Sequence, residues 1–414
     1  MPPTVLHLST YDANGGAARG AYALHRALLG QGFDSSMRVA RKATDDPTVH
    51  GLTGTGDLRF RLAQRTDRQI WRLQRSPTRS WRSPARVGSL SADEINSSSA
   101  DVVNLHWVTN GFLSIAEIGR ISKPIVWSLY DMWPFAGTEH YGNDGPAARW
   151  RAGYTRHNRP SDESGVDIDR RAWESKRRHW TRPMSIVAAS TWLRDCAATS
   201  ALFRDWPVAQ VPHVIDCEAF RPGDMAAARA ALGLPQDRPL VLFLSSAGIG
   251  DRRKGWDLLD TALVRVRRHH PTVEVVVVGS PASDQGTTSG APIHWHAAVN
   301  GDNALATLYR AASVTAVPSR EDNMPLTAME AQSSGRPVVA FRIGGLPDIV
   351  AHHQTGFLAE PFDTDGLADG LIQAIDDSLH DGAWATAARR RAMSTWSSEQ
   401  VVTRFADIYR QALA

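Results

Sequence analysis

The sequence predicts an α/β protein built from two doubly wound parallel-sheet domains, and three observations support this prediction. Short apolar runs alternate with segments of helical periodicity along the chain, a pattern typical of parallel sheets covered by helices. The 414 residues exceed one ordinary core and suit two domains of about 200 residues each. Pro207, Pro212 and Pro222 surround residues 213–221, and we expect a hinge in that segment.

The expected strands fall into two groups, one on each side of Pro212. The first group is Val5–Leu8, Val102–Leu105, Ile125–Leu129, Ile186–Ala189 and Val208–Val211. The second group is Leu240–Leu244, Val273–Val278, Ile293–His296, Val314–Val317 and Val338–Phe341. The last expected helix, Ser398–Leu413, carries apolar residues at helical spacing.

Composition favours a soluble globular protein. Hydrophobic residues make up 42% of the chain and charged residues 21%, which are globular values. No apolar run approaches the roughly 20 residues that span a bilayer, and the first residues lead straight into a strand, so no signal peptide is expected. Cys196 and Cys217 lack the spacing of a metal or redox site. We therefore expect a cytoplasmic location and reduced cysteines.

Residues 318–330 carry the strongest candidate for a binding motif. Asp322 and Glu330 are eight positions apart, which predicts two carboxylates about two turns apart on one helix face. The backbone N–H groups at the helix start, around Asn323, Met324, Pro325 and Leu326, suit an anion. A sugar joined to a diphosphate fits this pattern, with Glu330 on ribose hydroxyls and Asp322 on hexose hydroxyls. The alternative is a helix with two solvated acids.

Two further segments of the second half suit a phosphate-bearing ligand. Gly344 and Gly345 follow the strand Val338–Phe341, and glycines there let the backbone approach a ligand closely. The loop 245–255 follows Leu240–Leu244 and ends in Arg252, Arg253 and Lys254, which form a plausible diphosphate clamp. A solvated basic helix start is the alternative, but basic charge at a helix N-terminus is unfavourable, which favours a bound anion.

Three segments of the first half also end expected strands. Gly15 and Gly16 form a turn after the first strand, without the full dinucleotide fingerprint, and a simple helix cap is the alternative. His106 follows the second strand, and Tyr130 and Asp131 follow the third, with His140 nearby in sequence. A buried structural histidine is the alternative for His106.

These motifs resemble those of retaining GT-B glycosyltransferases of family 4. Asp322 to Glu330 matches the E-x7-E signature with Asp in first place, Gly344 to Asp348 matches G-G-x-P-E with Asp in last place, and Lys254-Gly255 matches K-G. Ile249 stands where the family commonly has Arg, so Arg253 or Arg252 would replace it. Residues 129–135 resemble the L-H-D-M-W-P-F of a bacterial subgroup that makes exopolysaccharides such as colanic acid, with Tyr130 at the histidine position.

The resemblance implies a GT-B fold, with two Rossmann-like domains facing a cleft. Residues 1–213 plus 396–414 would form the acceptor-binding domain, with the last helix returning to it, and residues 214–395 the donor-binding domain. It implies retaining transfer of a hexose from a nucleotide-diphosphate sugar to a glycan or lipid-linked acceptor, without metal or cofactor. The implied donor-binding residues are Gly15, Gly16, Arg253, Lys254, Asn323, Met324, Pro325, Leu326 and Glu330. The implied catalytic residues are Asp322, Asp131, Tyr130, His106 and His140.

Some residue roles stay open in the sequence. A tyrosine with a pKa of about 10 is no proton shuttle near neutral pH, so Asp131 with His106 or His140 would supply acid–base help. Asp167–Asp169 and Asp363–Asp365 resemble a metal-binding D-x-D, but we interpret both as loop or helix-start acids. Trp107 and Trp133, at strand ends, are candidates to stack on a sugar ring.

An arginine-rich segment, residues 57–86, holds nine arginines against two aspartates, and its interleaved apolar residues are Phe60, Ile70, Trp71, Leu73 and Trp81. It suits an anionic membrane surface or a lipid-diphosphate acceptor, and a solvated surface helix is the alternative. No nucleic-acid recognition motif accompanies it. Two other functions remain open for the whole chain: a GT-B-like nucleotide-sugar epimerase or hydrolase, and a catalytically weak nucleotide-binding homologue that acts as a scaffold.

Overall fold

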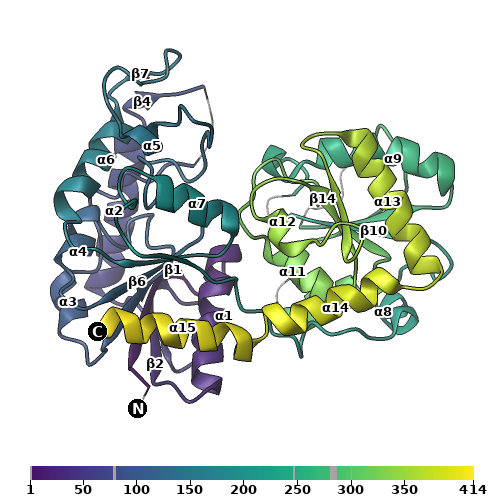
Figure 1. Cartoon of the computed structure of the whole chain (residues 1–414), viewed down its shortest axis with the longest axis horizontal. Coiled ribbons are helices and arrows are strands. Elements are labelled where there is room, and N and C mark those ends of the chain that lie inside the picture. The colour runs from purple at the N-terminus through teal and green to yellow at the C-terminus, as the bar shows by residue number, and fades with distance from the viewer. Residues whose placement is uncertain (1, 78–80, 246–247, 280–286, 300) are drawn as a thin grey trace. The chain divides into compact units, whose positions relative to one another are not determined.

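The computed structural model describes residues 2–77, 81–245, 248–279, 287–299 and 301–414. They form two compact units (Figure 1): unit 1 contains residues 1–212 and 401–414, and unit 2 contains residues 213–400. Arg79 of the arginine-rich segment, and Ser246 and Ala247 of the loop after Leu244, lie outside the described residues.

Unit 1 contains a seven-stranded parallel sheet with the strand order β3-β2-β1-β5-β6-β8-β9. Its strands are β1 (Val5–Tyr11), β2 (Ser35–Arg41), β3 (Val49–Gly51), β5 (Val102–Leu105), β6 (Ile125–Leu129), β8 (Ser185–Ala188) and β9 (Val208–Gln210). The order reverses between β1 and β5. In an open α/β sheet such a switch point opens a crevice outside the carboxyl ends of the strands.

Unit 2 contains a six-stranded parallel sheet with the order β12-β11-β10-β13-β14-β15. Its strands are β10 (Leu240–Leu244), β11 (Glu274–Val278), β12 (Ile293–His296), β13 (Val314–Val317), β14 (Val338–Phe341) and β15 (Gly356–Ala359). Here the order reverses between β10 and β13. The predicted α/β class with two doubly wound parallel sheets is confirmed.

Helices separate most of these strands. Those of unit 1 are α1 (Gly16–Gly30), α2 (Thr55–Trp71), α3 (Ala92–Asn96), α4 (Ile115–Arg120), α5 (Arg149–Ala152), α6 (Ile168–His179) and α7 (Thr191–Thr199). Those of unit 2 are α8 (Met225–Leu232), the 3-10 turn η1 (Arg252–Lys254), α9 (Trp256–His269), α10 (Asp302–Ala311), α11 (Leu326–Ser333), α12 (Leu346–Ile349), α13 (Thr364–Leu379) and α14 (Ala383–Thr395). The last helix, α15 (Ser398–Leu413), runs from unit 2 into unit 1, and a short antiparallel pair joins β4 (Gln74–Arg75) to β7 (Ser164–Gly165).

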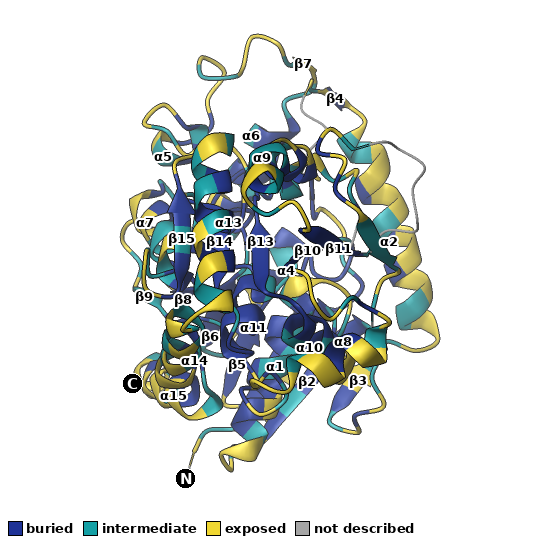
Figure 2. Ribbon diagram, turned by 90° about the vertical axis from the view of Figure 1, so that its right-hand side faces the viewer, coloured by how far each residue is buried: buried dark blue, intermediate teal, exposed yellow. Residues whose placement is uncertain are grey.

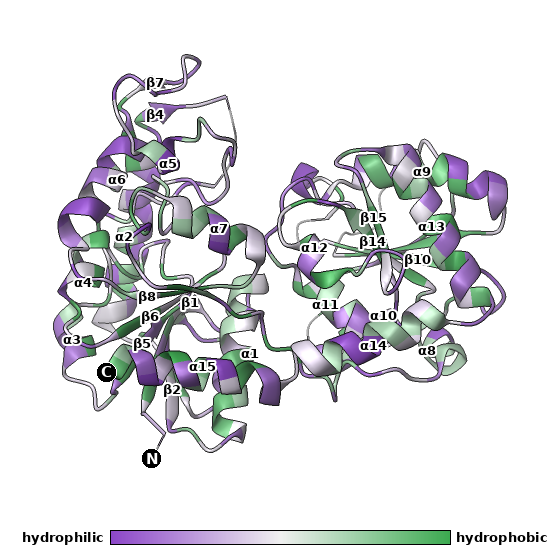
Figure 3. Cartoon of the chain, viewed as in Figure 1, coloured by the Kyte–Doolittle hydropathy of each residue, from purple (hydrophilic) through white to green (hydrophobic). Residues whose placement is uncertain are grey.

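Burial follows the layers of each unit. The sheet strands are mostly buried and the outer helix surfaces exposed (Figure 2), and the central strands are apolar while the helices alternate in hydropathy (Figure 3). This is the pattern expected when helices cover both faces of a parallel sheet. Among the described residues, no helix is both long and apolar enough to cross a membrane.

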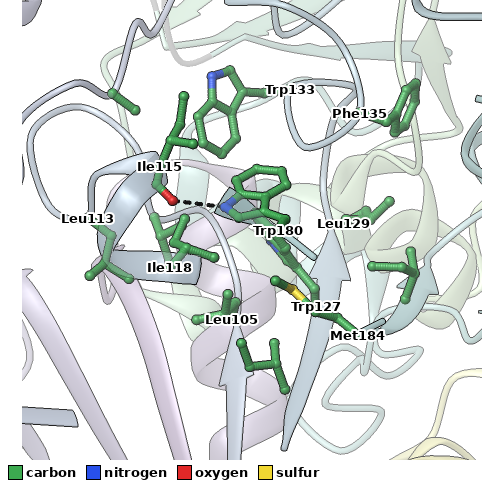
Figure 4. Packing of buried hydrophobic residues seen from close by; sticks show 14 of the residues in the cluster. Leu105, Leu113, Ile115, Ile118, Trp127, Leu129, Trp133, Phe135, Trp180 and Met184 are labelled. Atoms are coloured by element: carbon green, nitrogen blue, oxygen red, sulfur yellow. Dashed lines mark hydrogen bonds between the residues drawn. The ribbon is translucent and has the colours of Figure 1, made fainter. Parts of the chain in front are cut away.

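Tryptophans dominate one part of the unit 1 core (Figure 4). The rings of Trp127, Trp133 and Trp180 lie with their centroids 5.1–6.2 Å apart, and the Trp180 indole N–H donates to the carbonyl of Ile115 at 2.8 Å. Trp133 is only 2% exposed, and its indole N–H donates to the carbonyl of Ser83 at 2.7 Å. The expectation that Trp133 could stack on a sugar is therefore wrong, because both its ring and its N–H are used inside the core.

Candidate functional site

A charged cluster lies at the switch point of the unit 2 sheet. Lys254, at the end of η1, places its Nζ 2.7 Å from Oδ2 of Asp322, and Nη1 of Arg253 lies 3.6 Å from the same oxygen. The Ser319 hydroxyl donates to Asp322 at 3.1 Å. Burial alone would raise the pKa of Asp322, but Lys254, Arg253 and Ser319 outweigh it and hold that pKa below its usual value. Asp322 is therefore a buried carboxylate that stays charged at neutral pH.

Close packing between the loops after β10 and β13 builds this cluster. Gly255 has φ +73°, and a Cβ added there would lie 2.0 Å from the carbonyl oxygen of Pro318. Arg320 donates two hydrogen bonds of 2.7 Å to the Asp257 carboxylate, and its backbone N–H donates to the Arg253 carbonyl at 2.7 Å. The glycine after Lys254 is thus required by backbone contact between the loops, which fixes the position of the lysine.

Asp322 and Glu330 do not share a helix face, which corrects the sequence expectation. Helix α11 begins at Leu326, so Asp322 belongs to the preceding loop. Pro325 is the N-cap with extended backbone, and a proline disfavours helical conformation in the residue before it. Asn323 and Met324 are buried in that loop. Thr327, in the first turn of α11, lines a small pocket together with Lys254 and Ser319.

Glu330 lies in the second turn of α11 and is 1% exposed. Its Oε2 accepts a hydrogen bond from the hydroxyl of Tyr309, on α10, at 2.8 Å. Tyr309 has no motif around it in the sequence, so this partner was not foreseen. The hydrogen bond fixes the Glu330 carboxylate inside unit 2.

The glycine pair after β14 approaches protein backbone. Gly344 has φ +49°, and a Cβ added there would lie 1.9 Å from the carbonyl oxygen of Asp322. The N–H of Gly345 donates to that same oxygen at 3.4 Å. The expectation that Gly344 serves close approach to a ligand is corrected, because the atom it accommodates belongs to Asp322. The glycine therefore positions the Asp322 loop.

In unit 1 the turn after β1 is open to solvent. Gly15 (φ +92°) precedes α1, Gly16 is its first residue, and a Cβ added to either would meet nothing within 4 Å. The buried Asp12 carboxylate holds this turn by accepting from the backbone N–H groups of Ala43 and Thr44 at 2.9–3.0 Å. The two glycines thus leave free space at the switch point beside β5.

His106 and Tyr130 belong to a buried polar chain in unit 1. Nδ1 of His106 lies 3.2 Å from the Tyr130 hydroxyl, and Nε2 lies 2.8 Å from Nδ1 of His7 and 3.2 Å from the Asn104 amide nitrogen. Asn104 in turn accepts from the Tyr409 hydroxyl of α15 at 2.7 Å. Burial raises the pKa of Tyr130, and burial followed by the neighbouring histidines lowers the pKa of His7. Tyr130 and His7 are therefore both neutral near pH 7.

Asp131 and His140 form a second network, distinct from the first. Oδ2 of Asp131 lies 2.6 Å from Nδ1 of His140 and accepts from the indole N–H of Trp107 at 3.0 Å. Nε2 of His140 lies 2.8 Å from the buried Ser83 hydroxyl. Oδ1 of Asp131 accepts from the backbone N–H of Trp133 at 2.9 Å. The Asp131 carboxylate is thus already bonded on both oxygens.

The acids of the two D-x-D sequences have structural partners. Asp167 caps α6 and Asp363 caps α13 through backbone N–H groups, as expected for helix-start acids. Asp169 is buried and forms an ion pair with Arg82. No group of three or more His, Cys, Asp or Glu side chains in the described part of the chain is arranged to hold a metal ion.

Comparison with known proteins finds a family match for most of unit 2, which includes the Lys254–Asp322 cluster. Residues 238–377 match the family described as glycosyl transferases group 1. The D-inositol 3-phosphate glycosyltransferase of Saccharomonospora viridis is 35% identical over 215 residues, 48% of this chain and 49% of that protein. The protein of the same name from Segniliparus rotundus is 39% identical over 160 residues, 36% of this chain and 35% of that protein. The chain thus matches about half the length, or less, of these two curated relatives.

Solved structures resemble the chain along its whole length. Sucrose-phosphate synthase from Thermosynechococcus elongatus has a TM-score of 0.63 and 17% identity, over 99% of this chain and 98% of that chain. The catalytic domain of starch synthase IV from Arabidopsis thaliana, bound to ADP and acarbose, has a TM-score of 0.66 and 14% identity, over 100% of both chains. Anabaena HepE in complex with UDP-glucose has a TM-score of 0.63 and 15% identity, over 99% of this chain and 100% of that chain. At these identities the likeness shows the fold alone. Residues 238–377 thus match the family of glycosyl transferases group 1, and the whole chain has the GT-B fold.

Proposed function

We propose that this protein is a hexosyltransferase that moves a hexose from a nucleotide-diphosphate sugar to a glycan or lipid-linked acceptor, with retention of anomeric configuration and without a metal ion or cofactor. Unit 2 would bind the donor and unit 1 the acceptor. Bacterial surface polysaccharide or glycoconjugate synthesis is the context suggested by the resemblance of residues 129–135. Solved structures of the same fold with UDP-glucose or ADP support a nucleotide-sugar donor.

The cluster of Lys254, Arg253 and Asp322 at the unit 2 switch point is the observation that carries this proposal. Lys254 lines a small pocket together with Thr327 of the first turn of α11, and backbone N–H groups at a helix start favour an anion. A diphosphate there would be held by Lys254 and Arg253, and the same groups would stabilise the charge that develops as the nucleoside diphosphate departs. In this scheme the leaving phosphate oxygen takes the proton of the acceptor hydroxyl.

Asp322 would have two roles in that scheme. As a charged carboxylate it keeps Lys254 and Arg253 in place before the donor arrives. It also offers acceptor oxygens to the hexose hydroxyls, and hydrogen bonds to charged groups contribute about 1.5–3 kcal/mol each. Replacement of the family's glutamate by the shorter aspartate retains this charge.

Product analysis tests the proposal. A thermal-shift panel of UDP, GDP, ADP and dTDP identifies the nucleotide, and the matching nucleotide sugars are then incubated with simple glycoside acceptors. We expect a new glycoside whose anomeric configuration, read by NMR, equals that of the donor, and turnover that EDTA leaves nearly unchanged. An inverted product, or activity lost to EDTA and restored by Mn²⁺, would contradict the mechanism. Free sugar or an epimerised donor as the sole product would identify a hydrolase or epimerase instead.

We also propose peripheral contact of unit 1 with an anionic membrane through residues 57–86. Helix α2 buries Phe60, Ala63 and Asp67 and turns its other side outward. Leu58 and Leu62, one turn apart, are 59% and 51% exposed on that side. The exposed arginines of the segment are Arg59, Arg61, Arg65, Arg68, Arg72, Arg75 and Arg86. Apolar side chains among exposed arginines suit the surface of an anionic bilayer.

A further inference from the structure

Two aromatic side chains lie at the switch point of the unit 1 sheet. Tyr11 is the last residue of β1, and Trp107 follows the end of β5. The N–H of Thr10 donates to the Trp107 carbonyl at 2.8 Å, which ties the two strand ends together. The ring centroids of Tyr11 and Trp107 are 6.2 Å apart with 24° between the ring planes, so the rings are nearly parallel and offset. Both residues are partly exposed.

The Trp107 ring is held by its edge. Its indole N–H donates to Oδ2 of Asp131 at 3.0 Å, and an indole N–H points along the ring plane. That bond therefore fixes the orientation of the ring and occupies neither of its faces. Asp131 is fixed in turn by His140 at 2.6 Å, and His140 by Ser83 at 2.8 Å. Ser83, Asp131 and His140 are buried, so the support is protected from water.

The Tyr11 ring has a support of its own. Its hydroxyl accepts a hydrogen bond from the side-chain amide of Asn110 at 2.8 Å. Asn110 has a positive φ of 59°, a conformation that asparagine tolerates better than most residues. Both rings of the pair are thus anchored through polar atoms at their edges.

The chemistry of this arrangement suits a pyranose. A pyranose has a face of C–H bonds and a rim of hydroxyls, and an aromatic face carries negative quadrupole charge that attracts C–H bonds. Rings fixed before binding lose little conformational freedom when a ligand stacks on them. The site also lies at the strand ends, where open α/β sheets bind ligands.

We propose that Tyr11 and Trp107 form a platform on which one pyranose ring of the acceptor stacks, and that Asp131 and His140 are positioning residues that hold the Trp107 ring. The inference rests on the proposed function, in which unit 1 binds the acceptor. It gives Asp131 and His140 a role different from the acid–base role that the sequence suggests. Both carboxylate oxygens of Asp131 and both ring nitrogens of His140 already have hydrogen-bond partners in the network that holds Trp107.

A binding experiment tests the platform without turnover. Saturation-transfer NMR on the full chain uses methyl α-D-glucopyranoside and methyl α-D-mannopyranoside as probes, with the acyclic D-glucitol and uridine as comparison ligands. We expect saturation on the ring C–H protons of at least one pyranoside, and its loss in Trp107→Ala. The matched control Trp192→Ala removes another partly exposed tryptophan of unit 1, bonded to Asp144 at 2.8 Å, and should keep the signal. Pyranoside signals equal in both variants, or a Trp107 dependence for uridine alone, would overturn the platform.

Kinetics with the acceptor found by product analysis separate stacking from chemistry. Trp107→Ala should raise the acceptor KM about tenfold, equivalent to about 1.4 kcal/mol, and leave the donor KM unchanged. The acceptor KM of Trp107→Phe should lie between those of the unchanged protein and Trp107→Ala, because phenylalanine keeps a ring but lacks the indole N–H that bonds to Asp131. Asp131→Ala should raise the acceptor KM. Asp131→Asn should raise it much less, because its amide oxygen can still accept the hydrogen bond from the indole N–H of Trp107. A fall in kcat in both Asp131 variants with an unchanged acceptor KM would instead make Asp131 an acid–base residue.

The two proposals fail in different ways. Trp107-dependent binding of a pyranoside without turnover of any nucleotide sugar would refute the transferase and retain the platform. Turnover with an unchanged acceptor KM in Trp107→Ala would retain the transferase and refute the platform. The melting temperature and nucleoside diphosphate binding of each variant report whether it is folded, and Trp107→Phe provides the test where Trp107→Ala does not fold.

Discussion

Asp322 and Glu330 are both buried acids, but their partners differ. Asp322 faces Lys254 and Arg253, whereas Glu330 is bonded to the Tyr309 hydroxyl. Removing Asp322 takes away the carboxylate 2.7 Å from Lys254 and leaves Arg253 beside Asp251 alone of its two carboxylate neighbours, which favours an incoming diphosphate. Removing Glu330 takes away a buried carboxylate that accepts a hydrogen bond from Tyr309. The two substitutions should therefore affect binding and turnover differently.

We predict that Glu330→Ala weakens binding of the nucleoside diphosphate by roughly tenfold to a hundredfold, the loss expected for a hydrogen bond to a charged group. Asp322→Ala should leave that affinity unchanged or higher and mainly lower turnover. Calorimetry with the nucleotide selected by thermal shift measures both. Tyr309→Phe is the matched control, because it removes the Tyr309–Glu330 bond and keeps the carboxylate. A greater loss of affinity in Asp322→Ala than in Glu330→Ala would show that the roles are reversed.

At the scale of single residues, sequence identified the charged positions better than their contacts. Lys254 and Asp322 could be selected from their motifs, and the structure brings them together. Their direct ion pair was not visible in the sequence, because it depends on packing between the loops after β10 and β13. Tyr11 escaped notice for the same reason: its relation to Trp107 arises only when β1 and β5 pair.

At the scale of elements, the strands with continuous apolar runs were predictable, and several strands with few apolar residues were not. β5, β6, β10, β12, β13 and β14 have the expected bounds. β2, Ser35–Arg41, was missed because its sequence includes two serines and two arginines, although it pairs with β1 on one side and with β3 on the other. β15 has only four residues and begins with Gly356. Strands with few apolar residues depend on their neighbours for stability, and single-sequence periodicity does not detect that support.

Not every arginine of residues 57–86 contributes to an exposed basic surface, as the sequence suggests it would. Arg82 is buried, paired with Asp169 and Glu163, and does not contribute exposed charge. Arg61 is paired with Asp57 at 3.0 Å. The proposed membrane contact would therefore depend mainly on the other exposed arginines and on Leu58 and Leu62.

We predict that replacing Arg65, Arg68, Arg72 and Arg75 by Gln releases the protein from phosphatidylserine-containing vesicles at modest salt. Each arginine near an anionic surface contributes about 1 kcal/mol, and the effect is screened within a Debye length of about 8 Å. Co-sedimentation measures the bound fraction. The control replaces the exposed Arg171, Arg178, Arg268 and Arg390 by Gln, with the same change in net charge. Equal vesicle binding of both variants would contradict the proposal, because the association would then depend on the overall net charge and not on residues 57–86.

At the scale of the whole molecule, the chain divides unequally between its two units. Unit 2 is one continuous segment, residues 213–400, and holds its own six-stranded sheet and the Lys254–Asp322 pair. Unit 1 is discontinuous, because residues 401–414 of α15 pack into it. The buried residues of α15 are Val401, Val402, Phe405, Ile408 and Tyr409. The core of unit 1 therefore includes side chains that follow unit 2 in the sequence.

We predict that a fragment of residues 213–400 unfolds in one cooperative transition and still binds the selected nucleoside diphosphate. A fragment of residues 1–212 should be much less stable than unit 1 in the full chain, because burying a large apolar side chain contributes about 1.5–3 kcal/mol and α15 supplies several. A peptide of residues 398–414 added in trans should raise the denaturation midpoint of residues 1–212. The same peptide with Phe405→Ala and Tyr409→Ala is the control, because it lacks two buried rings and the hydrogen bond to Asn104. Equal effects of both peptides, or full stability of residues 1–212 alone, would show that α15 is not part of the unit 1 core.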